Sequence, residues 1–213
     1  MNSILRYIWF EIFVKGVVLV VLGLNIRNRC RLHRHKQIIL VANHNSHLDT
    51  LVLMSLFPYK EMNNIRPVAA MDYFLENPVR RWFAEKIVRI VPLSRHLRSV
   101  RVDPLKSCSD ALKEGYSLIL YPEGTRGNPE KLKDFKTGIS HLLERFPDIV
   151  VVPVFMHGLG KALPKGEFLL VPFYCDIFVG EPFFWQGDRV EFMETLNQSM
   201  NDLAKQGDFK AWN

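Results

Sequence analysis

The chain has 213 residues, of which 48% are hydrophobic and 23% are charged. This balance permits one sizeable folded core and excludes a disordered or low-complexity protein. Its three cysteines, Cys30, Cys108 and Cys175, are scattered and form no CxxC pair, so neither a disulfide framework nor a zinc site is indicated. A formal net charge of +6 favours an anionic partner, which is a nucleic acid, a membrane surface or a phosphorylated substrate.

The first predicted element, residues 4–24, is strongly apolar but is interrupted by charges at Arg6, Glu11 and Lys15. Its uncharged part, residues 16–24, is shorter than the roughly 20 residues that a membrane-spanning helix requires. Its aromatic side chains are of the types found at the depth of lipid headgroups. The pattern therefore predicts a helix that lies in the membrane interface.

A basic segment follows this helix, with five lysines and arginines between residues 27 and 36. An apolar anchor next to a polybasic patch is a combination that holds proteins on anionic membranes. We therefore expect residues 1–36 to associate with the membrane and residues 37–213 to form the folded domain. The alternative is a core helix followed by a solvated basic loop.

Short β-branched segments alternate with helical patterns along the rest of the chain. The expected strands are residues 37–42, 66–71, 88–93, 117–122, 149–156, 168–173 and 176–180, and the expected helices are residues 46–57, 78–86, 104–114, 137–145 and 188–204. This alternation predicts a single α/β domain with a mixed, largely parallel sheet flanked by helices. In such sheets, functional side chains gather beyond the carboxyl ends of the strands.

The first polar cluster, NHNSHLD at residues 43–49, directly follows an expected strand. Ser46 and Asp49 fit the start of a helix with Ser46 as N-cap, and this segment alone favours that interpretation. Capping leaves His44 unexplained, although its imidazole can take up and release a proton near neutral pH. His44 and Asp49 would lie about 140° apart on a continuous helix. They meet only if His44 precedes the helix and folds back over its first turn, leaving one ring nitrogen free as a base.

A second polar cluster, YPEGTRG at residues 121–127, also follows an expected strand. In isolation, Glu123 and Arg126 would be read as an ion pair on a solvated turn. The two clusters occur together with VPLSR at residues 91–95 and VVVPV at residues 150–154. This ordered set resembles the glycerolipid acyltransferase superfamily, and within it the bacterial lysophosphatidic acid acyltransferases most closely.

The first and third motifs match the NHxSxxD and PEGTR patterns of that superfamily at every defined position. The second motif departs from it, because the family usually has a Phe-Ile-x-Arg ending where this chain has Pro92, Leu93, Ser94 and Arg95. The resemblance therefore transfers a role to Arg95 less directly than to the residues of the other two motifs.

The resemblance implies that His44 is the general base and that Asp49 orients it. It also implies that the acceptor-binding loop comprises Glu123, Gly124, Thr125 and Arg126, where an arginine fork suits a phosphate monoester. Arg95 and Lys136 are further candidates for the same anion. His47 carries no family role and is interpreted as a surface residue at the helix start. Neither a metal nor another cofactor is expected.

The implied reaction moves a fatty acyl group from acyl-CoA or acyl carrier protein to a lysophospholipid, with 1-acyl-sn-glycerol-3-phosphate giving phosphatidic acid. A lyso-aminolipid or glycerol-3-phosphate as acceptor, and transacylation between phospholipids, are alternatives. A non-enzymatic lipid-binding protein on the membrane is another. Nucleic acid is not an expected partner, because the stacking segment RRWF at residues 80–83 lacks an accompanying nucleic-acid-binding pattern. The expected location is the cytoplasmic face of the membrane.

Overall fold

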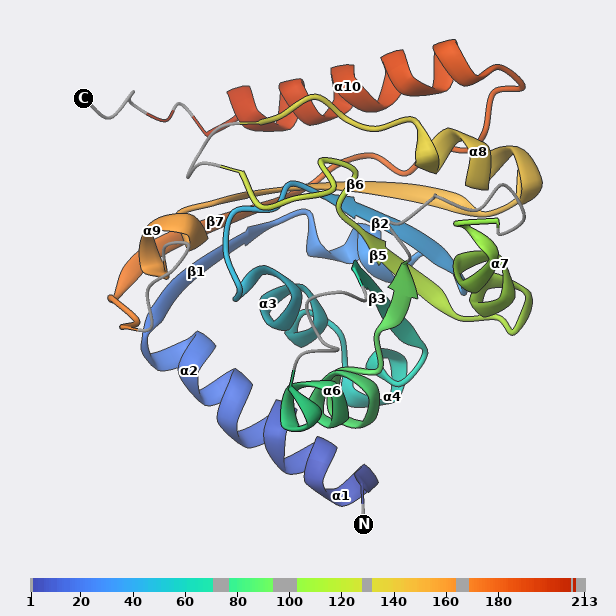
Figure 1. Cartoon of the computed structure of the whole chain (residues 1–213). Helices are drawn as coiled ribbons and strands as arrows, with labels where there is room; N and C mark the ends of the chain where they lie inside the picture. Colours follow the sequence, from blue (N-terminus) through green and yellow to red (C-terminus); the bar gives the residue numbers. More distant parts are fainter. Residues whose placement is uncertain are drawn as a thin grey trace.

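A seven-stranded sheet forms the centre of the fold, in the order β1-β7-β6-β2-β5-β3-β4 (Figure 1). The computed structural model describes residues 2–70, 77–93, 103–127, 132–163, 169–207 and 209. The strands are β1 (Leu22–Arg27), β2 (Ile38–Ala42), β3 (Ile65–Ala70), β4 (Val91–Leu93), β5 (Ser117–Leu120), β6 (Val150–His157) and β7 (Phe173–Val179).

The sheet is mixed and largely parallel, as the sequence predicted. The strand pairs β6–β2, β2–β5, β5–β3, β3–β4 and β1–β7 are parallel, and only β6–β7 is antiparallel among the described pairs. Parallel neighbours require crossover connections. The carboxyl ends of β2 and β5 consequently meet at one edge of the sheet, where the two polar clusters begin.

Helices cover both faces of the sheet (Figure 1). One face carries α1 (Asn2–Tyr7), η1 (Ile8–Val14), α2 (Lys15–Val20), α3 (Asp49–Ser55), α4 (Tyr59–Met62), α6 (Pro78–Phe83) and η3 (Ala84–Val88). The other face carries α7 (Lys106–Lys113), α8 (Gly138–Arg145) and α10 (Arg189–Lys205). The short elements η2 (Arg29–His33) and α9 (Leu159–Ala162) pack on the α3 face.

The central strands are buried on both sides, which explains their continuous apolar sequences. Along β2, Leu40 packs into the core under α3, whereas its neighbours Ile39 and Val41 pack into the core under α8 and α10. Every residue of β2 and β6 is buried. Polar side chains can therefore emerge only where these strands end.

The first strand corrects the expected domain boundary. Residues 22–27 were assigned to the amino-terminal helix and basic linker, but they form β1 and pair with β7 from Leu22↔Phe173 to Arg27↔Phe178. Alternate residues of β1, beginning with Leu22, turn toward the protein, while those between them are exposed. A boundary at residue 36 would cut this sheet, so the division into 1–36 and 37–213 does not follow the fold.

Two further expectations were wrong in detail. The two strands expected at 168–173 and 176–180 are replaced by the single strand β7, and residues 169–172 have no regular structure. The helix expected at 46–57 begins three residues later, at Asp49. Arg95 lies outside the described residues, as does Phe168.

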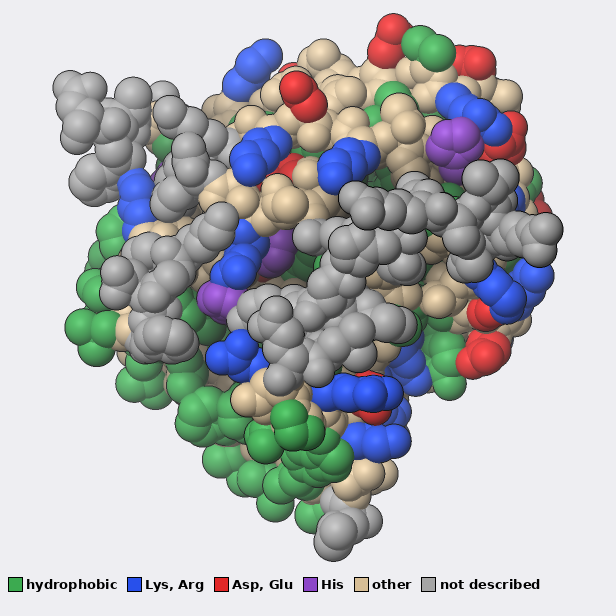
Figure 2. Space-filling view, in the orientation of Figure 1, with side chains coloured by type: hydrophobic (Ala, Val, Ile, Leu, Met, Phe, Trp, Pro, Cys, Tyr) green, Lys and Arg blue, Asp and Glu red, His purple; other side chains and the backbone are tan. Residues whose placement is uncertain are grey.

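The amino-terminal helix is both a core helix and an apolar surface. The helices α1, η1 and α2 follow one another directly and bury a stripe made by Arg6, Phe10, Val14 and Val18. The opposite face exposes six large apolar side chains, Ile4, Leu5, Tyr7, Ile8, Ile12 and Phe13. Figure 2 shows this face as part of an apolar patch at the lower left. Among the described helices, none is both long enough and apolar enough to cross a bilayer.

Arg6 ties this helix to the domain. Its Nε donates to Ile87 O at 2.7 Å, and its terminal nitrogens donate to Met62 O at 3.4 Å and to Asn63 Oδ1. These acceptors lie at the carboxyl ends of α4 and η3, where unpaired helix carbonyls favour a cation. Burial lowers the pKa of Arg6 to about 10, which still leaves the guanidinium charged at neutral pH. The exposed apolar face is thereby held in a fixed orientation.

Candidate active site

His44 and Asp49 meet at the carboxyl end of β2. His44 precedes α3, and its Nδ1 lies 2.9 Å from Asp49 Oδ2. The chain therefore folds back over the first turn of α3, as the five-residue spacing required. The His44 side chain is 22% exposed, whereas that of Asp49 is 1% exposed.

The Asp49 carboxylate is fixed by backbone donors as well as by the histidine. Its Oδ2 accepts from the N–H groups of Asn45 at 2.7 Å and Ser46 at 2.9 Å. Because a carboxylate accepts, the geometry assigns the imidazole proton to Nδ1. His44 Nε2 then carries the free lone pair, and it has no hydrogen-bond partner among the described residues.

The capping interpretation of this segment is only half right. Ser46 is not the N-cap, because α3 begins after Leu48 without a side-chain cap. Ser46 Oγ instead donates to Leu163 O at 2.9 Å and accepts from Leu48 N–H at 3.2 Å. The other half of a capping box is present, since Asp49 reaches back to the Ser46 amide. Asp49 Oδ2 thus binds both the backbone amides and the His44 ring.

Tyr121 supports the face of the imidazole, a contact that the sequence motifs did not indicate. The two rings stack with centroids 4.2 Å apart and an interplanar angle of 21°. The Tyr121 hydroxyl lies 2.9 Å from Thr50 Oγ1 on α3. Burial raises the pKa of Tyr121 well above its ordinary value, so the ring stays neutral beneath His44.

Asn43 fastens the end of β2 to the end of β6. Its Nδ2 donates to Met156 O at 2.8 Å, and its Oδ1 accepts from Met156 N–H at 2.7 Å. The side chain therefore satisfies both backbone groups of Met156 in the way that a neighbouring strand would. This pair of bonds explains why an asparagine begins the polar cluster.

The second cluster holds the backbone of the first. Glu123 Oε1 accepts from His44 N–H at 3.3 Å, and Gly127 N–H donates to His44 O at 2.8 Å. Glu123 is 3% exposed, and burial raises its pKa to about 7. Its carboxyl, expected to contact the acceptor, lies instead behind the histidine, while Oε2 has no hydrogen-bond partner among the described residues.

The remaining loop residues expose cationic groups near His44. Gly124 has φ +72°, so glycine is favoured by the backbone conformation, and the end of the Lys136 side chain lies directly against it. Lys136 N–H donates to Pro122 O at 2.9 Å, which keeps that lysine against the loop. Thr125 is exposed at the tip of the turn.

Arg126 joins the two clusters through a residue to which the sequence assigned no role. Its terminal nitrogen donates to His47 Nε2. Partial desolvation and then the Arg126 charge lower the pKa of His47, which keeps that imidazole neutral and able to accept. Lys133, also missed from the sequence, lies with its Nζ 3.4 Å from Arg126 O. The resulting surface is cationic, and Figure 2 shows histidine side chains in a hollow with lysines and arginines around it.

A histidine is held here by a buried aspartate, beside an arginine loop at the carboxyl edge of a parallel sheet. This arrangement is suited to activating a hydroxyl near an anionic group. The described residues contain no group of three or more His, Cys, Asp or Glu side chains that could hold a metal ion. The model of the acyltransferase family matches residues 23–157. The chain belongs to this family.

Three known proteins illustrate the similarity. The chloroplastic 1-acyl-sn-glycerol-3-phosphate acyltransferase of Arabidopsis thaliana is 34% identical over 129 residues, which are 61% of this chain and 34% of that protein. The lyso-ornithine lipid O-acyltransferase of Rhizobium meliloti is 27% identical over 135 residues, covering 62% of this chain and 42% of that protein. The match to the Arabidopsis protein thus spans about a third of its length. The 1-acyl-sn-glycerophosphate acyltransferase of Thermotoga maritima shares the fold, with a TM-score of 0.76 at 20% identity, covering 96% of this chain and 80% of that one.

The buried Glu123 carboxyl predicts a pH dependence of stability. The unfolded chain releases this proton near pH 4.5, whereas the folded protein retains it up to about pH 7. The free energy of unfolding should therefore fall as the pH rises through this window, by up to roughly 3 kcal/mol. Urea unfolding at several pH values, compared with Glu123→Gln, isolates this contribution because glutamine keeps the acceptor for His44 N–H. A difference between the two proteins that does not change with pH would contradict a protonated Glu123.

Proposed function

We propose that this protein transfers a fatty acyl group from an acyl thioester to the free hydroxyl of 1-acyl-sn-glycerol-3-phosphate, giving phosphatidic acid. The observation that carries the proposal is the 2.9 Å contact between His44 Nδ1 and Asp49 Oδ2, which leaves Nε2 open beside the cationic loop. The names of the similar proteins support both the reaction type and a lysolipid acceptor.

The proposed reaction uses His44 as base and then as acid. Nε2 takes the proton of the acceptor hydroxyl while the oxygen bonds to the thioester carbonyl carbon. The C–S bond breaks, and the imidazolium returns the proton to the leaving thiolate of coenzyme A or acyl carrier protein. Asp49 stabilises the positive charge that His44 acquires between these steps. No covalent acyl-enzyme, metal or other cofactor takes part in this scheme.

The acceptor phosphate is proposed to bind at Arg126. A guanidinium offers paired donors that match phosphate oxygens, and Arg126 is held toward the first cluster by its contact with His47. Lys136 and Lys133 lie on the same loop system and add positive charge. This arrangement favours an acceptor with a phosphate group over one without.

An acceptor of another class is the second candidate, because a similar protein is named for the acylation of a lyso-ornithine lipid. Such an aminolipid has no phosphate for Arg126 to bind. The ratio of activities on the two acceptors therefore distinguishes the candidates. A lipid-binding protein without catalysis is the non-enzymatic candidate, and it would show no acyl transfer on either acceptor.

Peripheral binding to the cytoplasmic face of an anionic membrane is also part of the proposal. Its support is the exposed apolar face of α1 and η1, together with the basic residues 27–36. The acceptor and product of the proposed reaction are both membrane lipids, so a site held at the membrane surface can exchange them laterally.

Two substitutions test the catalytic pair. His44→Ala is expected to lower the acylation rate by roughly two to four orders of magnitude. Asp49→Asn should lose most activity while its free energy of unfolding changes by about 1 kcal/mol or less, since an amide oxygen still accepts from the Asn45 and Ser46 amides. The measurement is transfer of a labelled acyl chain from the thioester, alongside urea unfolding.

Asp188→Asn is the matched control for Asp49→Asn. Asp188 accepts from the amides of Val190 at 2.8 Å and Glu191 at 3.0 Å at the start of α10, so it caps a helix without a histidine partner. Its substitution should leave the acylation rate unchanged. If Asp49→Asn lost activity only in proportion to stability, Asp49 would have a structural role alone.

Arg126→Ala tests the phosphate contact. With 1-acyl-sn-glycerol-3-phosphate, kcat/KM should fall about 10-fold to 100-fold, and Arg126→Lys should recover little of it if the contact is bidentate. With a lyso-ornithine lipid, the same substitution should have a smaller effect. Equal losses on both acceptors would instead show that Arg126 only supports His47 and the loop.

The membrane interaction is tested on the exposed face of the amino-terminal helix. Ile8 and Ile12 are 46% and 64% exposed, and changing each to Gln removes up to about 2 kcal/mol of apolar transfer energy. Sedimentation with anionic vesicles should show weaker binding of the double variant. Val190→Gln, which alters an exposed apolar residue on α10 across the sheet, should bind like the unmodified protein. If the double variant bound the vesicles as well as Val190→Gln does, this face would be excluded as the contact surface.

A further inference from the structure

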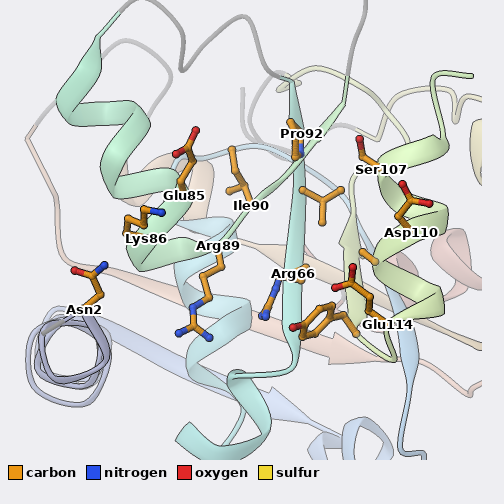
Figure 3. A pocket seen from close by; sticks show the side chains of 13 residues that line it. Asn2, Arg66, Glu85, Lys86, Arg89, Ile90, Pro92, Ser107, Asp110 and Glu114 are labelled. Atoms are coloured by element: carbon orange, nitrogen blue, oxygen red, sulfur yellow. The ribbon is translucent and has the colours of Figure 1, made fainter. Parts of the chain in front are cut away.

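A polar pocket lies along the β3–β4 edge of the sheet, and its arginine side chains lie near the amino-terminal ends of β3 and β4 (Figure 3). Its volume is about 570 Å³, and its lining comes from β3, η3, β4 and α7 (Figure 3). Because the strands are parallel, this position separates the two arginines from the carboxyl ends that carry the proposed active site. The proposed reaction assigns it no function.

Two arginines line this pocket from adjacent segments. Figure 3 shows Arg66, from β3, and Arg89, which precedes β4, reaching the pocket close to one another. The Arg66 guanidinium lies 3.8 Å from the centroid of the Tyr116 ring. It also donates to the carbonyls of Asn63 at 2.7 Å and Ile65 at 3.0 Å. These contacts hold Arg66 in place without neutralising its charge.

Carboxylates compensate these two arginines only in part, through the charge of Glu114 near Arg66. Within the described part of the chain, neither Arg66 nor Arg89 forms an ion pair with a carboxylate. Two acidic residues of the lining are engaged elsewhere, Glu85 with Arg81 at 2.8 Å and Asp110 with Lys106 at 2.6 Å.

Glu114 is the remaining acidic side chain of the lining, and Lys86 adds a further cation. Burial is the main cause that lowers the pKa of Arg66. The contact with Tyr116 raises this pKa, the charge of Arg89 lowers it and the charge of Glu114 raises it. This shift is consistent with two positive charges that lie close together. A ligand with two negative charges would relieve their repulsion.

The backbone at Arg89 gives a second, independent observation. Arg89 ends η3 in the left-handed region, with φ 62° and ψ 53°. Helices usually place glycine in this conformation because a Cβ is unfavourable there. Arg89 therefore keeps a long cationic side chain at a position where the backbone would accept glycine.

We propose that Arg66 and Arg89 form a binding site, separate from the active site, for the phosphate group of an anionic ligand. Guanidinium groups are suited to phosphate because they offer paired planar donors. A membrane lipid is the favoured source, since Asn2 lines the pocket and begins the helix that exposes Ile4 and Leu5. This choice of source rests on the membrane orientation proposed above, whereas the site itself does not.

The test uses the full chain in a non-ionic detergent, titrated with inorganic phosphate by calorimetry. Arg126→Ala serves as the parent, so that the loop of the proposed active site does not contribute. Adding Arg89→Gly should weaken phosphate binding about tenfold or more. Glycine suits the left-handed backbone at this position, so the variant should melt no lower than its parent. Arg66→Met should weaken binding similarly while keeping an unbranched stem against Tyr116.

A second arm identifies the source of the phosphate, using vesicles of phosphatidylcholine with and without phosphatidic acid. If Arg89→Gly also weakens binding to the phosphatidic acid vesicles, the ligand is a lipid headgroup. If it weakens only the binding of inorganic phosphate, the ligand is a soluble phosphate ester. Lys205→Gln on α10 removes one charge far from the pocket. It should change neither the affinity for inorganic phosphate nor the binding to phosphatidic acid vesicles. Phosphate affinity that is equal in Arg89→Gly, Arg66→Met and their parent would overturn the site.

Discussion

The buried carboxylate of Asp49 is the constraint on which the arrangement of the site depends. An ionised group that is almost fully removed from water is tolerated only when it is well hydrogen-bonded. Here a single oxygen accepts from His44 Nδ1 and from the amides of Asn45 and Ser46. These three donors come from consecutive residues, so the same requirement shapes the turn between β2 and α3 and orients the imidazole. The same set of hydrogen bonds therefore stabilises the local fold and orients His44 for the proposed catalysis.

The two polar clusters support one another from opposite sides of His44. Glu123 and Gly127 bind its backbone N–H and C=O, while Tyr121 stacks on its ring. Arg126 contacts His47 on the first cluster, so the cation proposed to bind phosphate is positioned relative to the proposed base. A reaction at a hydroxyl a few bonds from a phosphate requires such a fixed separation. Glu123, whose pKa is raised by burial, lies behind His44 and binds its backbone N–H.

The sequence predicted the sheet from local patterns, whereas the local pattern at residues 43–49 favoured a helix cap and the pairing of His44 with Asp49 was implied by the family resemblance. Continuous apolar segments identify the buried strands, and the position of the polar residues after β2 identifies the sheet edge. It did not predict β1, because Leu22 and Leu24 continue an apolar segment that a helix also accommodates. The inward direction of Glu123 and the contact of His47 with Arg126 join residues 79 positions apart. Motif spacing contains no information on which way such side chains point.

The amino-terminal helix shows why the choice between core helix and membrane helix was too narrow. Phe10 and Val14 belong to the same hydrophobic core as α3, and η1 packs against α3, the helix that begins with Asp49. The exposed apolar face lies on the outside of this same layer, and Arg6 prevents it from turning independently of the domain. A bilayer that bound this face would consequently hold the α3 layer, and with it the opening at His44, at a set orientation. Access of a lipid to the site would then follow from the packing of one helix rather than from a flexible anchor.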